Sequence, residues 1–301
     1  MSQLENYGEV DEVRWADITT LGVGLGKCVR LRPRTLKDLK ECVDELRQTR
    51  RRYLVVGGGS NLVGSDEDFD DVVLDLRRCC AQICHEGPRF TAGSAVTLLA
   101  LAKYAAKCGY GGLEKLCGIP GQLGGAATMN AGALGQEIGT LIAELRGLCA
   151  GRTWSCVPRA ADWGYRRGSL PDGVILTEVV VDLPKLSSSD ADGQIQSELR
   201  RRAAVTPKGR SAGSVFRNPP GQFAGALLEQ CGCKGLFANN LRVSEQHANW
   251  IVRVDGAPGR ASDCRSLVAE MRRRVRERFG IELECEWRWV DDLAANCVLR
   301  S

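Results

Sequence analysis

Residues 109–137 constrain the fold more than any other part of the chain. Nine of these residues are glycine, a density that suits neither helix nor strand because glycine loses the most backbone freedom on folding. The pattern predicts a packed loop whose bare backbone N–H groups face a large or anionic ligand, such as the pyrophosphate of a dinucleotide. The alternative is a system of tight glycine turns that binds nothing. The stretch is not a flexible linker, because apolar residues recur through it: Leu113, Leu116, Ile119, Leu123, Met129 and Leu134.

A second glycine loop follows a short apolar run. Residues 53–56 read Tyr-Leu-Val-Val, which predicts a buried strand, and residues 57–62 read Gly-Gly-Gly-Ser-Asn-Leu. Exposed backbone amides, the hydroxyl of Ser60 and the amide of Asn61 would form a phosphate cradle there. The loop lacks the Gly-Lys-Ser/Thr ending of a Walker loop and the GxGxxG spacing of a dinucleotide fingerprint. A plain turn at the end of a strand is the alternative.

The bulk composition is that of a soluble globular protein with two or three domains. The chain has 301 residues, of which 44% are hydrophobic and 26% charged, which are ordinary proportions for this class. No apolar run approaches the ~20 residues that a membrane-spanning helix needs. The first residues, 1–16, read as a polar leader and not as a signal peptide. The net charge of +4 is too small to indicate nucleic-acid binding. We therefore expect a cytoplasmic protein without membrane or nucleic-acid partners.

The fourteen cysteines do not form a zinc pattern. Cys231 and Cys233 make a CxC pair, and Cys79, Cys80 and Cys84 make a cluster that could bind a metal. The chain has only two histidines to complete such a site, at positions 85 and 247. Since no export signal is evident, we expect reduced thiols and no metal.

Hydrophobic periodicity predicts most of the remaining elements. Helices are expected at 34–51, 97–108, 223–230 and 262–279, with Ser262 as the N-cap of the last and Gly280 as its end. Strands are expected at 28–31, 72–76, 141–149, 153–157, 174–183, 249–254 and 283–290. Residues 186–192, Leu-Ser-Ser-Ser-Asp-Ala-Asp, are expected to form a polar loop or linker.

The last expected strand has a clear two-residue alternation. Leu283, Cys285 and Trp287 fall on one face, and Glu284 and Glu286 fall on the other. The strand therefore presents two carboxylates from one side.

Six motifs follow one another between about residue 17 and residue 290, and six in this order are hard to obtain by chance. They are residues 55–62 (VVGGGSNL), 112–121 (GLEKLCGIPG) with 124–126 and 129–133, 164–166 (GYR), 212–219 (AGSVFRNP), 243–250 (VSEQHANW) and 283–288 (LECEWR). In order and spacing they resemble the flavin-dependent UDP-N-acetylenolpyruvoylglucosamine reductase family of peptidoglycan synthesis.

The resemblance implies an α+β fold with an FAD-binding region of the PCMH type at 17–200, in subdomains of about 17–85 and 86–200. A C-terminal α+β substrate domain would follow at 201–301. The short segment between Arg166 and Ser214 looks like the family's compact type, which lacks an inserted substrate-capping loop. The implied FAD-binding residues are Gly57, Gly58, Gly59, Ser60, Asn61, Leu62, Gly118, Ile119, Pro120, Gly121, Gly124, Gly125, Ala126, Asn130, Ala131 and Gly132.

The resemblance also implies the reaction of a UDP-N-acetylmuramate dehydrogenase. NADPH would reduce FAD, which would pass the hydride to the enolpyruvyl group of UDP-N-acetylglucosamine enolpyruvate. Arg166 matches the arginine that polarises the substrate carboxylate, Ser214 the serine that delivers a proton, and Glu286 the glutamate that assists the arginine. The implied substrate-binding residues are Tyr165, Arg217, Asn218 and His247.

The sequence departs from the family pattern in three places. Gly168 replaces a serine that many relatives carry, residues 239–242 (NNLR) replace a segment close to GGAQ, and Cys285 replaces a proline. These changes concern the substrate pocket more than the flavin site. Two alternatives follow: a PCMH-type flavin oxidase, or a non-catalytic relative that binds a nucleotide sugar. We expect a monomer.

Overall fold

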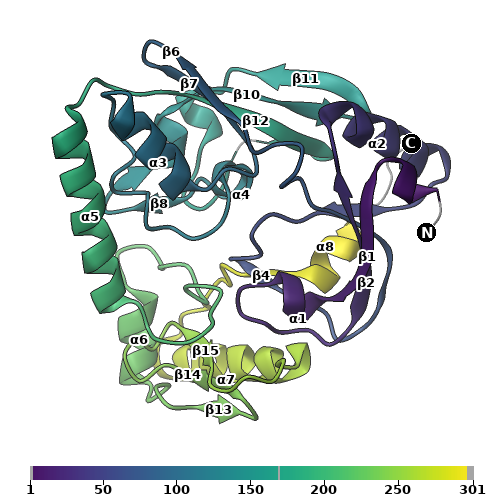
Figure 1. Cartoon of the computed structure of the whole chain (residues 1–301). Coiled ribbons are helices and arrows are strands. Elements are labelled where there is room, and N and C mark those ends of the chain that lie inside the picture. The colour runs from purple at the N-terminus through teal and green to yellow at the C-terminus, as the bar shows by residue number, and fades with distance from the viewer. Residues whose placement is uncertain (1–2, 169, 297–301) are drawn as a thin grey trace. The chain divides into compact units, whose positions relative to one another are not determined.

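The computed structural model describes residues 3–168 and 170–296, and the chain folds into two compact units (Figure 1). Unit 1 comprises the residues up to Asp11, Arg30–Gly58 and Val73–Ala204. Unit 2 comprises Glu12–Val29, Gly59–Val72 and the residues from Val205 on. Both contain helices and strands, as expected for the α+β class. This division differs from a linear one at residue 200, because residues 12–29 and 59–72 group with the C-terminal third.

Three strands carry the chain from one unit to the other: β1 (Gly8–Arg14), β2 (Lys27–Pro33) and β5 (Phe69–Leu74). With β3 (Tyr53–Val55) they form a sheet in the order β1-β2-β5-β3. The expected polar leader at 1–16 therefore contains a strand, preceded by the short helix η1 (Leu4–Asn6) and followed by α1 (Trp15–Ile18). Trp15 is fully buried, which explains why a polar run ends in a large aromatic residue.

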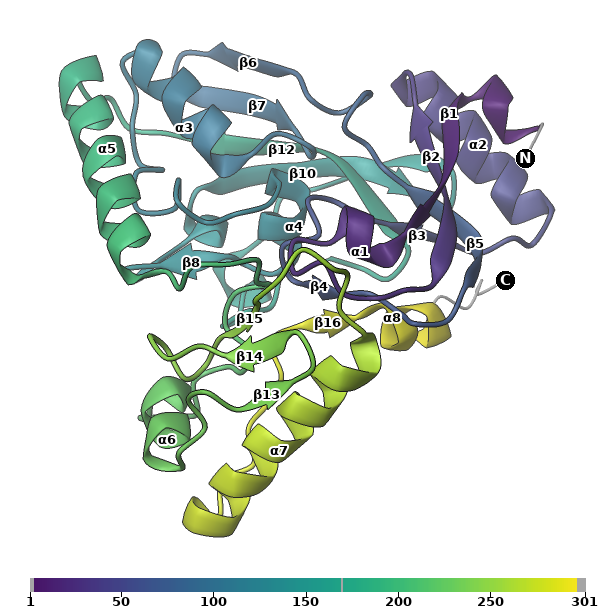
Figure 2. The same cartoon turned by 60° about the horizontal axis from the view of Figure 1, so that its bottom comes forward.

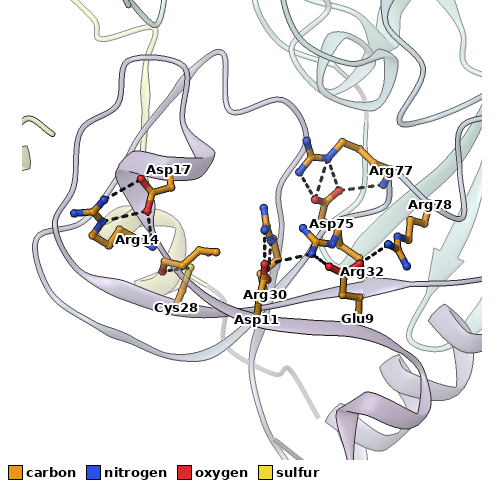
Figure 3. A network of polar contacts seen from close by, with 11 residues as sticks. Glu9, Asp11, Arg14, Asp17, Cys28, Arg30, Arg32, Asp75, Arg77 and Arg78 are labelled. Atoms are coloured by element: carbon orange, nitrogen blue, oxygen red, sulfur yellow. Dashed lines mark hydrogen bonds and ion pairs between the residues drawn. The ribbon is translucent and has the colours of Figure 1, made fainter. Parts of the chain in front are cut away.

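Ion pairs connect β1 and β2 within unit 1 (Figure 3). The guanidinium of Arg30 donates to Asp11 at 2.6 Å, and Arg32 reaches the same carboxylate at 3.2 Å. Arg32 and Arg78 both pair with Glu9. The hydrogen bond from Arg30 holds the pKa of Asp11 below its ordinary value. Half-buried pairs of this kind fix the position of one strand on its neighbour.

The larger sheet of unit 1 has the order β11-β10-β12-β7-β6. Its paired strands are antiparallel: β6 (Ile83–Glu86), β7 (Arg89–Gly93), β10 (Ile142–Cys149), β11 (Arg152–Cys156) and β12 (Val174–Asp182). Strands β10, β11 and β12 match the expected ones closely, whereas β6 was not predicted. Helix α3 (Leu98–Lys107) packs its apolar face into the same core as Phe90, Val179 and Val181 (Figure 1). Helix α2 (Leu36–Gln48) is also close to its prediction.

The prediction of a loop at 186–192 is wrong. Helix α5 (Ser188–Val205) begins there, and its start is fixed by Ser187, whose hydroxyl accepts a hydrogen bond from the N–H of Asp190 at 3.2 Å. Few apolar residues mark this helix, since only Ala191 and Ile195 belong to the buried core. Periodicity was too weak to distinguish it from a polar linker.

Unit 2 is built on the three-stranded sheet β13-β14-β15, formed by β13 (Phe237–Ala238), β14 (Leu241–Val243) and β15 (Ile251–Arg253). Helix α7 (Ala261–Phe279) runs along this sheet (Figure 2) and shares its core, with Leu267, Met271 and Val275 packed among Leu241 and Ile251. The unit also contains α6 (Ala224–Gln230), α8 (Val290–Asn296) and the parallel pair of β4 (Leu62–Val63) with β16 (Arg288–Trp289).

The N-terminus of α7 is capped by a residue distant in sequence. The prediction of Ser262 as N-cap is wrong, because Ser262 lies inside the helix and Arg260 is the capping position. The carboxylate of Asp66 accepts hydrogen bonds from the backbone N–H groups of Ala261, at 2.9 Å, and Ser262, at 3.0 Å. Asp66 thus satisfies donors that the helix leaves unpaired. Gly280 ends the helix in the left-handed conformation, as predicted.

Candidate active site

In unit 1 the two glycine loops that the sequence separates lie against each other. A Cβ atom on Gly57 would stand 3.0 Å from Oε1 of Gln122, and one on Gly58 would stand 3.2 Å from the Cα of Gly121. The second loop is held by backbone hydrogen bonds from Leu123 to Val96 (2.7 Å) and from Gly124 to Ser94 (2.8 Å). Glycine at 57 and 58 permits this close approach, to a side chain at Gly57 and to backbone at Gly58.

This surface fits a ligand that binds bare backbone. Gly57, Gly58 and Gly125 are exposed. At Gly125, in the short helix α4 (Leu123–Thr128), a Cβ atom would meet no protein atom within 4 Å. Packing of the protein therefore does not require glycine there, and the space beside it is open. The predicted cofactor residues Ile119, Pro120 and Ala126 belong to the same segment, in which Ala126 is buried.

Helix α5 also contributes to this loop. The aliphatic stem of Arg202 packs on Gly118, where a Cβ atom would stand 2.5 Å from Cδ of the arginine. Burial lowers the pKa of Arg202 from its ordinary value. The sequence offered no signal for this contact, because the segment that starts α5 looked like a linker.

In unit 2 the end of the first glycine loop is tied to the expected C-terminal strand. The side-chain amide of Asn61 donates to the carbonyl of Glu286 at 3.0 Å, and the carbonyl of Asn61 accepts from the N–H of Arg288 at 3.0 Å. Leu62 then pairs with Arg288 in the β4–β16 ladder. At Gly59, with φ of +62°, a Cβ atom would collide with the carbonyl of Ile18. Ser60 lies between Gly59 and Asn61, whose positions these contacts fix.

Arg166 occupies the turn of a tight hairpin in unit 1. Gly164 and Arg167 exchange two backbone hydrogen bonds, at 2.9 and 3.0 Å, so Tyr165 and Arg166 form a two-residue turn. Arg166 has φ of +55°, which is uncommon for a residue with a side chain. Its Nη1 donates to the carbonyl of Gly132 at 3.1 Å, and its guanidinium lies 5.2 Å from the ring centroid of Tyr165. Half of the Tyr165 surface is exposed.

Asn130, predicted to bind the cofactor, has its side chain engaged within unit 1. It is fully buried and has φ of +44°. Its Nδ2 donates to Oε2 of Glu137 at 2.7 Å and to the carbonyl of Gly164 at 3.0 Å. Its Oδ1 accepts from the N–H of Gly139 at 3.0 Å. The following residues, Ala131 and Gly132, are half-buried.

Ser214 and Glu286 come from neighbouring extended segments of unit 2. The N–H of Glu286 donates to the carbonyl of Val215 at 2.8 Å, and the N–H of Arg217 donates to the carbonyl of Glu284 at 2.9 Å. Ser214 itself forms an isolated bridge with Trp250 on its other side. Both Ser214 and Glu286 are half-buried. Leu283 and Trp287 are buried and Glu284 is exposed, as the alternation predicted, but Cys285 and Glu286 are both half-buried. The prediction of a strand over 283–290 is wrong in its extent, because only Arg288–Trp289 forms a regular strand.

Asn249 holds the Ser214 segment and was missed from the sequence. Its Oδ1 accepts from the N–H of Phe216 at 2.9 Å, and its Nδ2 donates to the carbonyl of the same residue at 2.8 Å. The carbonyl of Asn249 also accepts from the N–H of Val215 at 2.9 Å. Only 3% of its surface is exposed. The motif His-Ala-Asn-Trp gave the position but no reason to assign it this contact.

The predicted substrate residues of unit 2 lie on short loops. Nη1 of Arg217 is 3.4 Å from Oε2 of Glu284, and Oδ1 of Asn218 accepts from the N–H of Ala224 at 3.0 Å. Nδ1 of His247 accepts from the N–H of Asn249 at 3.2 Å. Burial lowers the pKa of His247, so the ring favours the neutral form with its proton on Nε2. Its geometry agrees with a structural or positioning histidine.

The three departures lie at the following places in the structure. A Cβ atom on Gly168 would collide with the carbonyl of Ala127, and Ser169, which follows, lies outside the described residues. Residues 239–240 form the turn between β13 and β14, with Asn239 at φ of +51°. Arg242 is an exposed residue of β14. Cys285 bridges Phe216 through its backbone.

Within residues 3–168 and 170–296 no group of three or more potential ligands could hold a metal ion. The thirteen cysteines found there are free thiols. The same part of the chain contains no helix that is long and apolar enough to span a bilayer.

Comparison with known proteins adds the following likenesses. Residues 29–150 match an FAD-binding domain, and residues 206–290 match the C-terminal domain of UDP-N-acetylenolpyruvoylglucosamine reductase. UDP-N-acetylenolpyruvoylglucosamine reductase 2 of Symbiobacterium thermophilum is 39% identical over 235 residues, covering 77% of this chain and 76% of its own. The Geobacter metallireducens reductase is 35% identical, covering 91% of each chain. The crystal structure of the Thermus caldophilus reductase superposes with a TM-score of 0.78 at 34% identity, covering 93% of this chain and 98% of its own.

Proposed function

The chain belongs to the UDP-N-acetylenolpyruvoylglucosamine reductase family, and we propose that Arg166, Ser214 and Glu286 are its catalytic residues. It is an FAD-dependent oxidoreductase that uses NADPH to convert UDP-N-acetylglucosamine enolpyruvate into UDP-N-acetylmuramate for peptidoglycan synthesis. When bound, FAD supplies the hydride chemistry and carries a hydride from NADPH to the enolpyruvyl double bond.

Arg166 is suited to bind the substrate carboxylate. Hydride addition places negative charge on the enolate that includes this carboxylate, and a guanidinium can donate to it from two nitrogens at once. The hairpin fixes the backbone of Arg166, and the contact with Gly132 occupies one guanidinium nitrogen at 3.1 Å. A donor that is oriented before the substrate arrives stabilises the developing charge without reorganisation.

Ser214 is the proton donor in this proposal. An enolate is basic enough to take a proton from a serine hydroxyl, although the hydroxyl is a weak acid toward water. Its position is set from two sides, by the bridge to Trp250 and by the pairing of Val215 with Glu286. Glu286 is assigned the assisting role that the family resemblance gives to this glutamate.

The FAD-binding residues are proposed to act mainly through their backbone. The proposed residues of unit 1 are Gly57, Gly58, Gly118, Ile119, Pro120, Gly121, Gly124, Gly125, Ala126, Asn130, Ala131 and Gly132. Those of unit 2 are Gly59, Ser60, Asn61 and Leu62. An FAD-binding region at 17–200 and a substrate domain from 201 are part of the proposal, supported by the matches at 29–150 and 206–290.

The substrate is a nucleotide sugar, so we assign Arg217 and Asn218 to its diphosphate. Tyr165 is assigned to substrate binding. His247 is assigned a positioning role, because its ring packs on α6 beside Gly225 and accepts from Asn249. We also propose that the protein is a cytoplasmic monomer.

One observation carries the catalytic assignment in unit 2: the 2.8 Å hydrogen bond that joins the segments of Ser214 and Glu286. The test compares Ser214→Ala with the control Ser266→Ala, an exposed serine of α7. Stopped-flow absorbance should show unchanged reduction of the flavin by NADPH in both variants. Reoxidation by the enolpyruvyl nucleotide should slow by roughly 10²-fold or more in Ser214→Ala alone. Equal reoxidation rates in the two variants would remove Ser214 from the mechanism.

A further inference from the structure

The turn that carries Arg166 adopts an unfavourable backbone and must be held by its surroundings. A residue with a side chain at φ of +55° costs free energy and persists only when neighbouring contacts over-determine it. The two hydrogen bonds between Gly164 and Arg167 close the turn but do not fix where the hairpin lies in unit 1. A further contact must provide that position.

The side chain of Asn130 provides one such contact, in addition to the hydrogen bond from the N–H of Gly168 to the carbonyl of Thr128 at 2.9 Å. The amide of Asn130 is fully buried, and one hydrogen of its Nδ2 goes to the carbonyl of Gly164, the first residue of the hairpin, at 3.0 Å. The same carbonyl accepts from the N–H of Arg167 at 3.0 Å. The hydrogen bond from Asn130 therefore fixes the hairpin at the residue where it closes.

Glu137 determines which way the amide of Asn130 faces. A carboxylate only accepts hydrogen bonds, so Oε2 of Glu137 at 2.7 Å requires the nitrogen of the amide on its side. The N–H of Gly139 at 3.0 Å requires the oxygen on the other side. With both ends fixed, the remaining hydrogen on Nδ2 is directed at Gly164.

Glu137 is connected to Arg166 by a second route. Glu137 belongs to β9 (Gln136–Glu137) and pairs with Gly132 of β8 (Gly132–Ala133). The carbonyl of Gly132 accepts the hydrogen bond from Nη1 of Arg166 at 3.1 Å. A Cβ atom on Gly132 would stand 2.9 Å from Cγ of Glu137 and 3.4 Å from this Nη1. Glu137 thus lies near the guanidinium of Arg166, across Gly132, and also contacts the hairpin through Asn130.

We propose that Glu137 is a positioning residue for Arg166, acting through the amide of Asn130 on the hairpin and through Gly132 on the guanidinium. The inference rests on the proposed role of Arg166 and deepens it. Glu137 touches neither substrate nor cofactor in this account. Its contribution is the placement of a guanidinium, and a misplacement of about 1 Å can reduce a rate by ~10²-fold.

The test is a double-mutant cycle read out on the two half-reactions. Glu137→Ala should bind FAD and be reduced by NADPH at a rate within about twofold of wild type, because the half-reaction with NADPH does not use Arg166 in this proposal. Reoxidation by the enolpyruvyl nucleotide should slow by roughly 10- to 100-fold. Glu137→Gln should recover most of the rate, since its Oε1 can still accept from Asn130.

The cycle is completed with Arg166→Ala and the double variant. If Glu137 acts through Arg166, adding Glu137→Ala to Arg166→Ala should change reoxidation by less than about twofold. A further loss as large as that of the single variant would overturn the inference, as would normal reoxidation in Glu137→Ala. If Glu137→Ala does not bind FAD, Glu137→Asp replaces it in the cycle. This variant withdraws the carboxylate by one methylene and should give the same changes in the two half-reactions.

The single variants distinguish the function of Arg166 from the positioning role of Glu137. Normal reoxidation in Arg166→Ala would remove the proposed function of Arg166, whatever Glu137 does. Slow reoxidation in Arg166→Ala together with normal reoxidation in Glu137→Ala would leave that function intact and remove only the positioning role.

Discussion

The backbone N–H of Glu286 donates a 2.8 Å hydrogen bond to the carbonyl of Val215, the residue that follows Ser214. This bond makes two segments that are distant in sequence into neighbours. On the other side of the Ser214 segment, the side chain of Asn249 accepts from the N–H of Phe216 and donates to the carbonyl of the same residue. The assigned proton donor therefore lies on a strand-like segment fixed along both edges.

Removal of the Asn249 side chain should destabilise the protein strongly. Asn249→Ala would leave the N–H and the carbonyl of Phe216 unpaired in a buried place, and each such group costs roughly 1–3 kcal/mol. We expect a loss of about 2–4 kcal/mol in the free energy of unfolding, measured by urea denaturation. The control is Asn240→Ala. The side-chain amide of Asn240 donates hydrogen bonds to Asp255 and Ala257 at the surface. Its removal should lower the free energy of unfolding by less than about 1 kcal/mol. Equal losses in the two variants would contradict this account.

The cap provided by Asp66 predicts a pH dependence of stability. Burial alone would raise the pKa of Asp66, but the hydrogen bonds from Ala261 and from the backbone and hydroxyl of Ser262 hold the pKa below its ordinary value. A carboxyl whose pKa is depressed by folding stabilises the protein above its unfolded pKa of about 3.9. The contribution is lost as the pH falls through the lower folded pKa.

Comparison of wild type with Asp66→Ala at several pH values measures this contribution. The difference in unfolding free energy should be about 1–2 kcal/mol at pH 7 and should shrink below a pH of about 4. The control is Glu67→Ala, because Glu67 is exposed and next to Asp66 in the sequence. It should change the unfolding free energy at none of these pH values. A difference for Asp66→Ala that grows on acidification would have the wrong sign.

The open space beside Gly125 predicts a variant that separates folding from cofactor binding. Gly125→Leu should leave the stability of the FAD-free protein unchanged or slightly raised, because no protein atom lies within 4 Å of the added Cβ and leucine favours helix. Its Kd for FAD should rise by more than about tenfold, as measured by fluorescence titration.

Gly193→Leu is the matched control for this variant. Gly193 is also a helical glycine with no protein atom within 4 Å of a Cβ, and it belongs to α5. Its FAD affinity should equal that of wild type. If both variants lose FAD affinity, or neither does, the surface beside Gly125 is not part of the cofactor site.

The sequence identified the elements with strong local signals. The two glycine loops were expected to be packed and ligand-facing, and residues 57–58 do lie against residues 121–122. Strands such as β10 and β12 were close to their expected bounds because long apolar runs mark them. The start of α5 was missed, because its face toward the core carries few apolar residues.

The contacts that arrange the site were not accessible from the sequence. Asp66 caps α7, a helix that begins far along the chain. The side chain of Asn249 accepts the hydrogen bond from the N–H of Phe216 that a neighbouring strand would otherwise accept. The three internal hydrogen bonds of the Asn130 side chain were also not predicted. Side-chain contacts between distant residues leave no period or spacing for a sequence pattern to reveal.

The most direct measurement is the visible absorption spectrum of the purified protein before and after anaerobic NADPH. We expect a flavin spectrum that NADPH bleaches and that recovers on addition of UDP-N-acetylglucosamine enolpyruvate, with UDP-N-acetylmuramate as the product. Recovery in air with no response to this nucleotide would indicate an oxidase. A colourless protein that takes up no added FAD would contradict the account at its centre.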